Sequence, residues 1–273
     1  SIAGNKHVLS GLSAIGNNTN VGLFGSVHLT TEQHASNERA FAKDILIKDS
    51  NFVSTGDAGT AGALAGFAYA SSNAGTAGNV VLTNKVGTKH ANVYGKQVGS
   101  GLVGKVVFGN NNYVLNINKA YVNSDVYGTK ASGIAKVYNG TGSSTSNLIK
   151  VDQFYYVGTL DSQEGTRALI ADNNNANAKT SSVYAVNYTD TVLMLNTTAG
   201  KQNITARALG TEMLNGFDWV ETWVRTNPGE YPEFNSKVEY WIKNVDESLN
   251  VTTKYIIAIT INGGILENVA AVI

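Results

Sequence analysis

The sequence contains no cysteine, only two prolines and little charge, and each of these shortages excludes a class of protein. Without cysteine the chain forms no disulfide framework, thiolate zinc site or iron–sulfur cluster. Charged residues make up only 15% of the chain, and 20 basic side chains balance 20 acidic ones. The chain therefore lacks the excess of basic side chains that attracts the phosphates of a nucleic acid. No apolar run reaches the roughly 18 residues of a membrane span.

What the sequence does contain is a repeated glycine–apolar–glycine element. Three copies end at Gly25, Gly66 and Gly104, and a decayed fourth copy ends at Lys136 in place of the last glycine, so the spacing shortens gradually along the chain. Recurrence of one motif at similar intervals is typical of repeat architectures. The residues of the element are Gly22, Leu23, Phe24 and Gly25; Gly62, Leu64 and Gly66; Gly101, Leu102 and Gly104; and Gly133.

Each copy is followed by a polar loop and then a short alternating apolar run, which is typical of strands rather than helices. These runs are residues 45–49, 80–84, 114–118 and 148–151, followed by the pair 183–188 and 192–195. Short strands at a repeat of about 20 or 40 residues predict an all-β fold, a right-handed parallel β-helix. A β-sandwich also has short strands between turns, but it gives no reason for one motif to recur.

Several details follow from this prediction. Glycine is expected at the corners, either because φ is positive there or because a neighbouring coil passes close by. The apolar residue between two glycines is expected to point into the interior. At roughly 20 residues per coil, about ten coils spaced by about 4.8 Å would make a rod about 50 Å long.

The glycine elements resemble those of the GLUG-repeat family of secreted and surface β-helix proteins, which are similar to bacterial adhesins. A second resemblance lies downstream, where such arrays commonly close with a short helix and a Phe-Asp-x-x-x-x-Trp element. The residues that carry it are Phe217, Asp218, Trp219, Trp223, Tyr231 and Pro232. The resemblance implies an extracellular setting and no shared catalytic residues. Because it begins partway through a coil pattern, we expect sequence before Ser1 to have been removed.

The closing residues have two interpretations. Trp219 and Trp223 are four residues apart and would share one helical face, where they could form a platform for stacking sugars. We favour a cap, because an open end of a repeat array exposes apolar core and unpaired strand edges.

Two groups of residues are candidate sites of chemistry. His28, Glu32 and His34 lie close together in sequence and could gather around a metal, but the polar stretch 29–39 more plainly indicates an insertion loop. Asp161 and Glu164 are the first candidates for a pair of carboxyl groups that cleaves polysaccharide. The acidic residues show no repeating spacing, so solvated loop positions are the favoured interpretation. Residues 172–177 lack the glycine and glutamate of a calcium loop.

The last residues are strongly apolar. Residues 255–261 and 265–273 flank an Asn-Gly-Gly turn and predict a β-hairpin, which packs on the cap or joins a neighbouring subunit. The expected organisation is a β-helix over residues 1–203, a cap over 204–242 and a hairpin or joining strands over 243–273.

These observations lead to a hypothesis of function. We expect a non-enzymatic extracellular surface protein, an adhesin-like stiff spacer that presents binding loops to a host-cell surface, a glycan or another protein. The loops are 29–39 and 172–179. The first alternative is a subunit of an extracellular filament, sheath or layer, associating through residues 255–273. The second is a polysaccharide lyase or hydrolase. No cofactor, metal, nucleic acid or membrane span is expected.

Overall fold

The computed structural model describes most of the chain. The described residues are 2–4, 6–71, 78–109, 112–139, 147–164, 167–172, 177–186, 192–196, 201–204, 206–207, 214–225, 230–235, 238–245 and 251–259.

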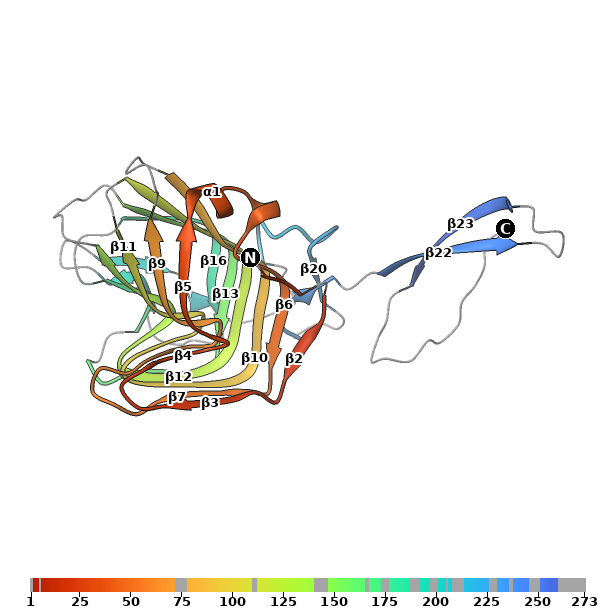
Figure 1. Ribbon diagram of the computed structural model, residues 1–273. Coiled ribbons are helices and arrows are strands. Elements are labelled where there is room, and N and C mark those ends of the chain that lie inside the picture. Colours follow the sequence, from red (N-terminus) through yellow and green to blue (C-terminus); the bar gives the residue numbers. More distant parts are fainter. Residues whose placement is uncertain are drawn as a thin grey trace.

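The described fold is mainly β, and most strands belong to one large curled sheet (Figure 1). Its strands are β1 (Ile2–Ala3), β2 (Val8–Ser10), β3 (Ser13–Gly16), β4 (Asn20–Val21), β5 (Phe24–Thr30), β6 (Ala42–Lys48), β7 (Asn51–Ser54), β8 (Thr60–Gly62), β9 (Ala65–Ser71), β10 (Gly78–Ser100), β11 (Val103–Phe108), β12 (Tyr113–Asn139), β13 (Leu148–Val157), β14 (Leu160–Ser162), β15 (Ala168–Asp172), β16 (Asn177–Val186), β17 (Val192–Asn196), β18 (Lys201–Ile204) and β19 (Ala206–Arg207). Apart from the antiparallel pair β17–β18, the pairings in this sheet are parallel.

Each stretch of chain pairs with the stretch one repeat later, so the sheet is built in successive layers. One series of partners runs through β1, β6, β10, β12, β13 and β16: Ile2, Ala42, Thr83, Ile117, Val151 and Thr180. The glycine elements form a second series through β5, β9, β11, β12 and β15: Phe24, Ala65, Val103, Ala135 and Ile170. The copies of the element end at positions 25, 66, 104 and 136. The paired residues Phe24, Ala65, Val103 and Ala135 each lie one residue before such an end. The sequence period is therefore the period of strand pairing.

Two repeat lengths were considered for a coil, about 20 and about 40 residues, and the shorter one is wrong. A layer uses roughly 30 to 40 residues, because each one contains several strands with corners between them. The six layers of the first series span only about 24 Å, five steps of about 4.8 Å, rather than the expected length of about 50 Å.

The inner face of the sheet is closely filled. The apolar residues of the repeat element point into this core as predicted, and Leu64, Leu102 and Ile134 are completely buried. Leu64 N–H donates to the Leu102 carbonyl, and Leu102 N–H donates to the Ile134 carbonyl. The element thus places one side chain per layer in the core while its backbone bonds the next layer.

The glycines of the element serve close packing between layers rather than positive φ. A Cβ on Gly104 would lie 2.5 Å from the Gly66 carbonyl oxygen, and one on Gly22 would lie 2.5 Å from the Gly62 carbonyl oxygen. Of the two reasons expected for these glycines, close approach of a neighbouring layer is the one observed, and left-handed backbone occurs elsewhere, at a recurring corner of the first series. Non-glycine residues occupy that corner: Asp44, Lys85, Lys119, Gln153 and Ser182. A single left-handed residue is tolerated at each corner because the paired strands on both sides hold it in place.

The remaining elements lie outside the large sheet. An insertion after β5 contains α1 (Thr31–His34) and the 3-10 helix η1 (Asn37–Arg39). Downstream, β20 (Trp223–Val224) pairs with β21 (Glu233–Phe234), and β22 (Val238–Val245) pairs with β23 (Val251–Ile259), both antiparallel. The second hairpin stands apart from the large sheet in Figure 1.

These elements bear on the expected boundaries. The large sheet reaches β19, beyond residue 203, and β22 crosses the expected boundary at 242/243. β23 covers most of the 255–261 run and pairs with β22 upstream. Its expected partner, 265–273, lies outside the described residues. So do residues 208–213, where the short helix of the cap was expected, and the middle of the loop 172–179.

Candidate functional site

Residues 214–225 and 230–235, which we call the flank segment, contain the cap residues singled out in the sequence. They pack on the outer face of the sheet. Phe217 and Trp223 lie in one apolar cluster with Tyr121 of β12 and Tyr155 of β13, on the face opposite the main core. The flank segment also contacts β10, through the ion pair between Lys89 and Glu233. It also reaches β16, where the Tyr184 ring lies 5.9 Å from that of Phe217. These residues therefore lie along the side of successive layers, β10, β12, β13 and β16, and not across an open end as expected.

The outer cluster is built from stacked aromatic rings. Tyr121 and Tyr155 occupy equivalent positions in neighbouring layers, and their parallel rings lie 5.1 Å apart. Trp223 packs against both, at 6.2 and 6.0 Å, and Phe217 and Phe234 each lie 4.7 Å from Trp223. Burial raises the pKa of both tyrosine hydroxyls well above the ordinary value. The cluster therefore stays neutral and apolar at physiological pH.

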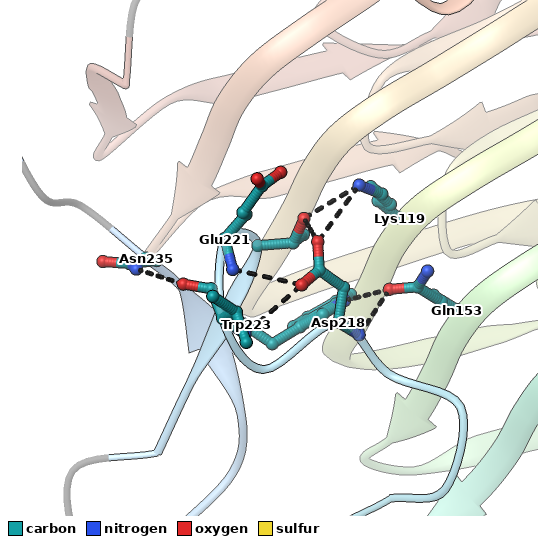
Figure 2. A network of polar contacts seen from close by, with 8 residues as sticks. Lys119, Gln153, Asp218, Glu221, Trp223 and Asn235 are labelled. Atoms are coloured by element: carbon teal, nitrogen blue, oxygen red, sulfur yellow. Dashed lines mark hydrogen bonds and ion pairs between the residues drawn. The ribbon is translucent and has the colours of Figure 1, made fainter.

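Polar contacts fix the flank segment on this cluster (Figure 2). Gln153, a left-handed corner residue of β13, accepts hydrogen bonds from Trp223 Nε1 at 2.9 Å and from Asp218 N at 3.0 Å. Lys119, the corner residue of β12, donates to Thr222 Oγ1 at 2.8 Å and lies 3.7 Å from the Asp218 carboxylate. The corner residues of two layers thus hold the same segment.

Asp218 organises the turn within the flank segment. Its Oδ1 accepts from the Val220 and Glu221 N–H groups at 3.2 and 3.1 Å, and its Oδ2 accepts from the Thr222 hydroxyl at 2.9 Å. These hydrogen bonds, that of Glu221 first, hold the pKa of Asp218 below its ordinary value. Asp218 therefore acts as the carboxylate that closes this turn.

The other cap residues are mostly enclosed. The Tyr155 hydroxyl donates to the Pro232 carbonyl at 2.5 Å, and Tyr231 packs against the outer cluster. Trp219 and Trp223 do not share a helical face, because the residues around them form turns. Trp223 is fully buried and Phe217 is 6% exposed, so neither offers a face to a sugar. Trp219 stays half-buried, with its Nε1 donating to the Leu214 carbonyl at 3.2 Å.

The two histidines of the candidate metal group, His28 and His34, have separate structural partners. His28 on β5 contacts the Ser71 hydroxyl, whereas His34 is 2% exposed and its Nδ1 contacts the Arg39 carbonyl at 3.1 Å. The His34 ring also packs edge-on against Phe41. Glu32 is exposed. In the part of the chain that the structure describes, no three His, Asp or Glu side chains are grouped as a metal site.

The two candidate acids are placed on or beside β14. Asp161 is exposed, at the position that pairs with Tyr127, and Glu164 forms an ion pair with Lys130 at 3.3 Å. Glu164 thus has a basic partner beside it. Cleavage of polysaccharide by this pair stays a prediction.

A small pocket lies on the outer surface, at residues that the sequence analysis did not single out. Its volume is about 180 Å³, and it is lined by Asp57, Lys96, Gln97, Thr129, Lys130 and Tyr138. No spacing in the sequence marks these residues as a group, because they come from different layers. The sequence could have indicated them only through the repeat, because corner residues that are one repeat apart in the sequence lie next to each other in the fold.

Comparison with known proteins adds no relative. No protein-family model, no curated protein and no solved structure matches this chain. Among the described residues, no helix has the length and apolar character needed to cross a membrane.

Proposed function

We propose that this chain is a module of a non-enzymatic extracellular surface protein of the adhesin-like GLUG-repeat kind. In this proposal the curled sheet is a right-handed parallel β-helix that acts as a stiff spacer, and its insertion acts as a contact loop. The observation that carries the proposal is the parallel pairing that continues from β1 to β16 at the period of the glycine element.

The pairing supports a stiff body. Each inner layer is hydrogen-bonded to the layer before it and the layer after it, while the core side chains fill the space enclosed by the curl. Bending such a stack would break backbone hydrogen bonds on one side and compress packed side chains on the other. The right hand follows from the strong preference of parallel crossover connections for that hand.

The insertion has the features of a presented loop. It is held at its base by the buried His34 ring and by the Asn84 and Asn118 side chains, which donate to Asn37. Its outer residues are exposed: Glu32, Gln33, Ala35, Ser36, Glu38 and Arg39. A polar surface on a rigid base loses little entropy on binding, which suits recognition.

Attachment tests this proposal. Beads coated with the full chain would be applied to host-cell monolayers and to immobilised glycans, and attached beads counted. A variant with Glu32→Ser, Gln33→Ser and Arg39→Ser changes only exposed side chains of the insertion. We expect it to reduce attachment at least fivefold.

The control variant changes exposed charges away from the insertion, Lys150→Ser with Asp161→Ser. It should attach like the wild type. Equal attachment of the wild type and the insertion variant would remove the loop from the mechanism, and no attachment of the wild type to any surface would refute the adhesin proposal.

A further inference from the structure

The lysine-lined pocket lies where three successive layers meet. Asp57 comes from the turn between β7 and β8, Lys96 from a corner of β10, and Lys130 from the equivalent corner of β12. The strands beside these corners are directly paired, Thr60 with Val98 and Val98 with Lys130. The pocket is therefore part of the layered body, and its walls have fixed relative positions.

The pocket carries an excess of positive charge in a chain that is neutral overall. Lys96 is paired with Asp57 at 2.6 Å, and Lys130 is paired with Glu164 at 3.3 Å. One further ammonium group lies close by, because Lys105 Nζ is 4.3 Å from the centre of the Tyr138 ring. Among the described residues, three lysines thus lie near two carboxylates at this site. This excess of positive charge attracts a small anion.

The other lining groups suit the hydroxyls and the ring of a sugar. The Gln97 carboxamide offers both donors and an acceptor. The Thr129 hydroxyl donates to the Lys96 carbonyl at 2.7 Å and keeps lone pairs as acceptors. Tyr138 provides a flat apolar surface and a hydroxyl, and burial raises its pKa so that it stays neutral.

The size of the pocket limits the ligand. Its volume of about 180 Å³ lies below the roughly 300 Å³ of pockets that hold drug-sized ligands, so it accommodates one small unit. A carboxylate on a single sugar ring combines the charge, the hydroxyls and the flat apolar face that these walls would contact.

We propose that this pocket binds one uronic acid residue of an extracellular glycan, with its carboxylate beside Lys130 and Lys96 and its ring against Tyr138. This inference rests on the proposed function, because it names a glycan class that the surface protein would recognise.

Titration of the full chain tests the pocket. D-glucuronate, neutral methyl β-D-glucoside and acetate would each be added while the protein amide signals are followed by NMR. We expect glucuronate to shift the signals of residues 96–97 and 129–130 with saturation in the millimolar range. The glucoside and acetate should each bind at least tenfold more weakly. Raising the salt concentration should weaken glucuronate binding, because the ammonium groups are solvent-accessible.

Variants at the pocket sharpen the test. Lys130→Met removes one ammonium group from a partly exposed side chain and should weaken glucuronate binding at least tenfold. Tyr138→Ala should weaken it by removing the flat surface, whereas Tyr138→Phe should retain most of it. Lys150→Met, a lysine on exposed β13 surface, is the matched control and should leave binding unchanged. Circular dichroism confirms that each variant is folded.

Several outcomes would overturn the proposal. They are the absence of glucuronate binding, equal binding of glucoside, equal binding of acetate, and full binding by Lys130→Met. Loss of glucuronate binding together with normal bead attachment would overturn the pocket and leave the proposed function standing, since attachment is scored separately on the insertion variant.

Discussion

At the residue scale, the repeat glycines are set by the backbone of the neighbouring layer. Gly22, Gly62, Gly66 and Gly104 each lie against main-chain atoms, so any side chain would force two layers apart. Gly25 belongs to the same sequence element but lies at an exposed position with more room. The motif therefore mixes glycines that packing requires with one that it does not.

Gly104→Ala should destabilise the fold by about 1–3 kcal/mol, the usual range for overpacking. Its Cβ would lie 2.5 Å from the Gly66 carbonyl oxygen and 2.9 Å from that of Ala61, and neither backbone atom can move alone. Urea unfolding followed by circular dichroism measures the change. Gly25→Ala is the matched control, with its nearest contact at 3.2 Å, and should change stability by less than about 1 kcal/mol. Equal effects of both changes would contradict the packing argument.

His34 should make the insertion sensitive to pH. Burial lowers the pKa of its imidazole below the ordinary 6.5, against the opposing effect of the hydrogen bond with the Arg39 carbonyl. The folded state therefore takes up a proton less readily than the unfolded state. The stability contributed by neutral His34 is complete above pH 6.5 and is lost as the pH falls below that value.

NMR titration of the imidazole protons checks this sign. His34 should titrate below 6.5, and amide protection in residues 31–39 should fall between pH 7.5 and pH 5. A His34→Phe variant keeps a ring against Phe41 and should lose this pH dependence. Titration of His34 above 6.5 would show that the interpretation is wrong.

At the scale of elements, the flank segment is held by contacts from distant parts of the chain. Tyr121, Tyr155 and Gln153 come from β12 and β13, far upstream of the groups they contact. The sequence predicted that this segment caps an open end of the array, whereas its described residues pack on the outer face of the sheet. Its place on the side of the layers was not predictable, because outward-facing Tyr121 and Tyr155 look like ordinary exposed positions of alternating strands.

Trp223→Ala should release the flank segment. The fully buried indole links the stacked tyrosines, Phe217 and Phe234, and removal of such a ring costs about 3–5 kcal/mol. Hydrogen exchange with mass spectrometry should show lost protection in residues 214–225 while the core strands stay protected. Trp223→Phe, which keeps an aromatic ring, should lose less. Unchanged protection of 214–225 in the alanine variant would mean that the aromatic cluster does not hold the segment.

At the scale of the whole molecule, stability should be graded along the layers. β10 and β12 are paired with described strands on both sides, whereas β1 to β5 pair only with the second layer among the described residues. The first layer also leaves apolar side chains partly exposed, with Ile15 at 74% and Val8 at 50%. Its amides are therefore less well protected by packing.

Hydrogen exchange of the wild type tests this gradient. Protection should be highest in β10 and β12 and at least tenfold lower in β2 and β3. Uniform protection across the layers would indicate that the whole array opens as one cooperative unit.

The sequence by itself determined the strand content, the repeat period and the inward direction of Leu64, Leu102 and Ile134, because all three depend on local alternation and on a motif that returns at each layer. The tertiary structure decided the rest: layers longer than the short coil first expected, corners at non-glycine residues, a flank segment on the side, and a pocket of lysines from separate corners. These features depend on which residues become neighbours across layers. Which residues become neighbours is set by the number of strands and corners in each repeat. The local alternation of apolar and polar residues does not encode that number.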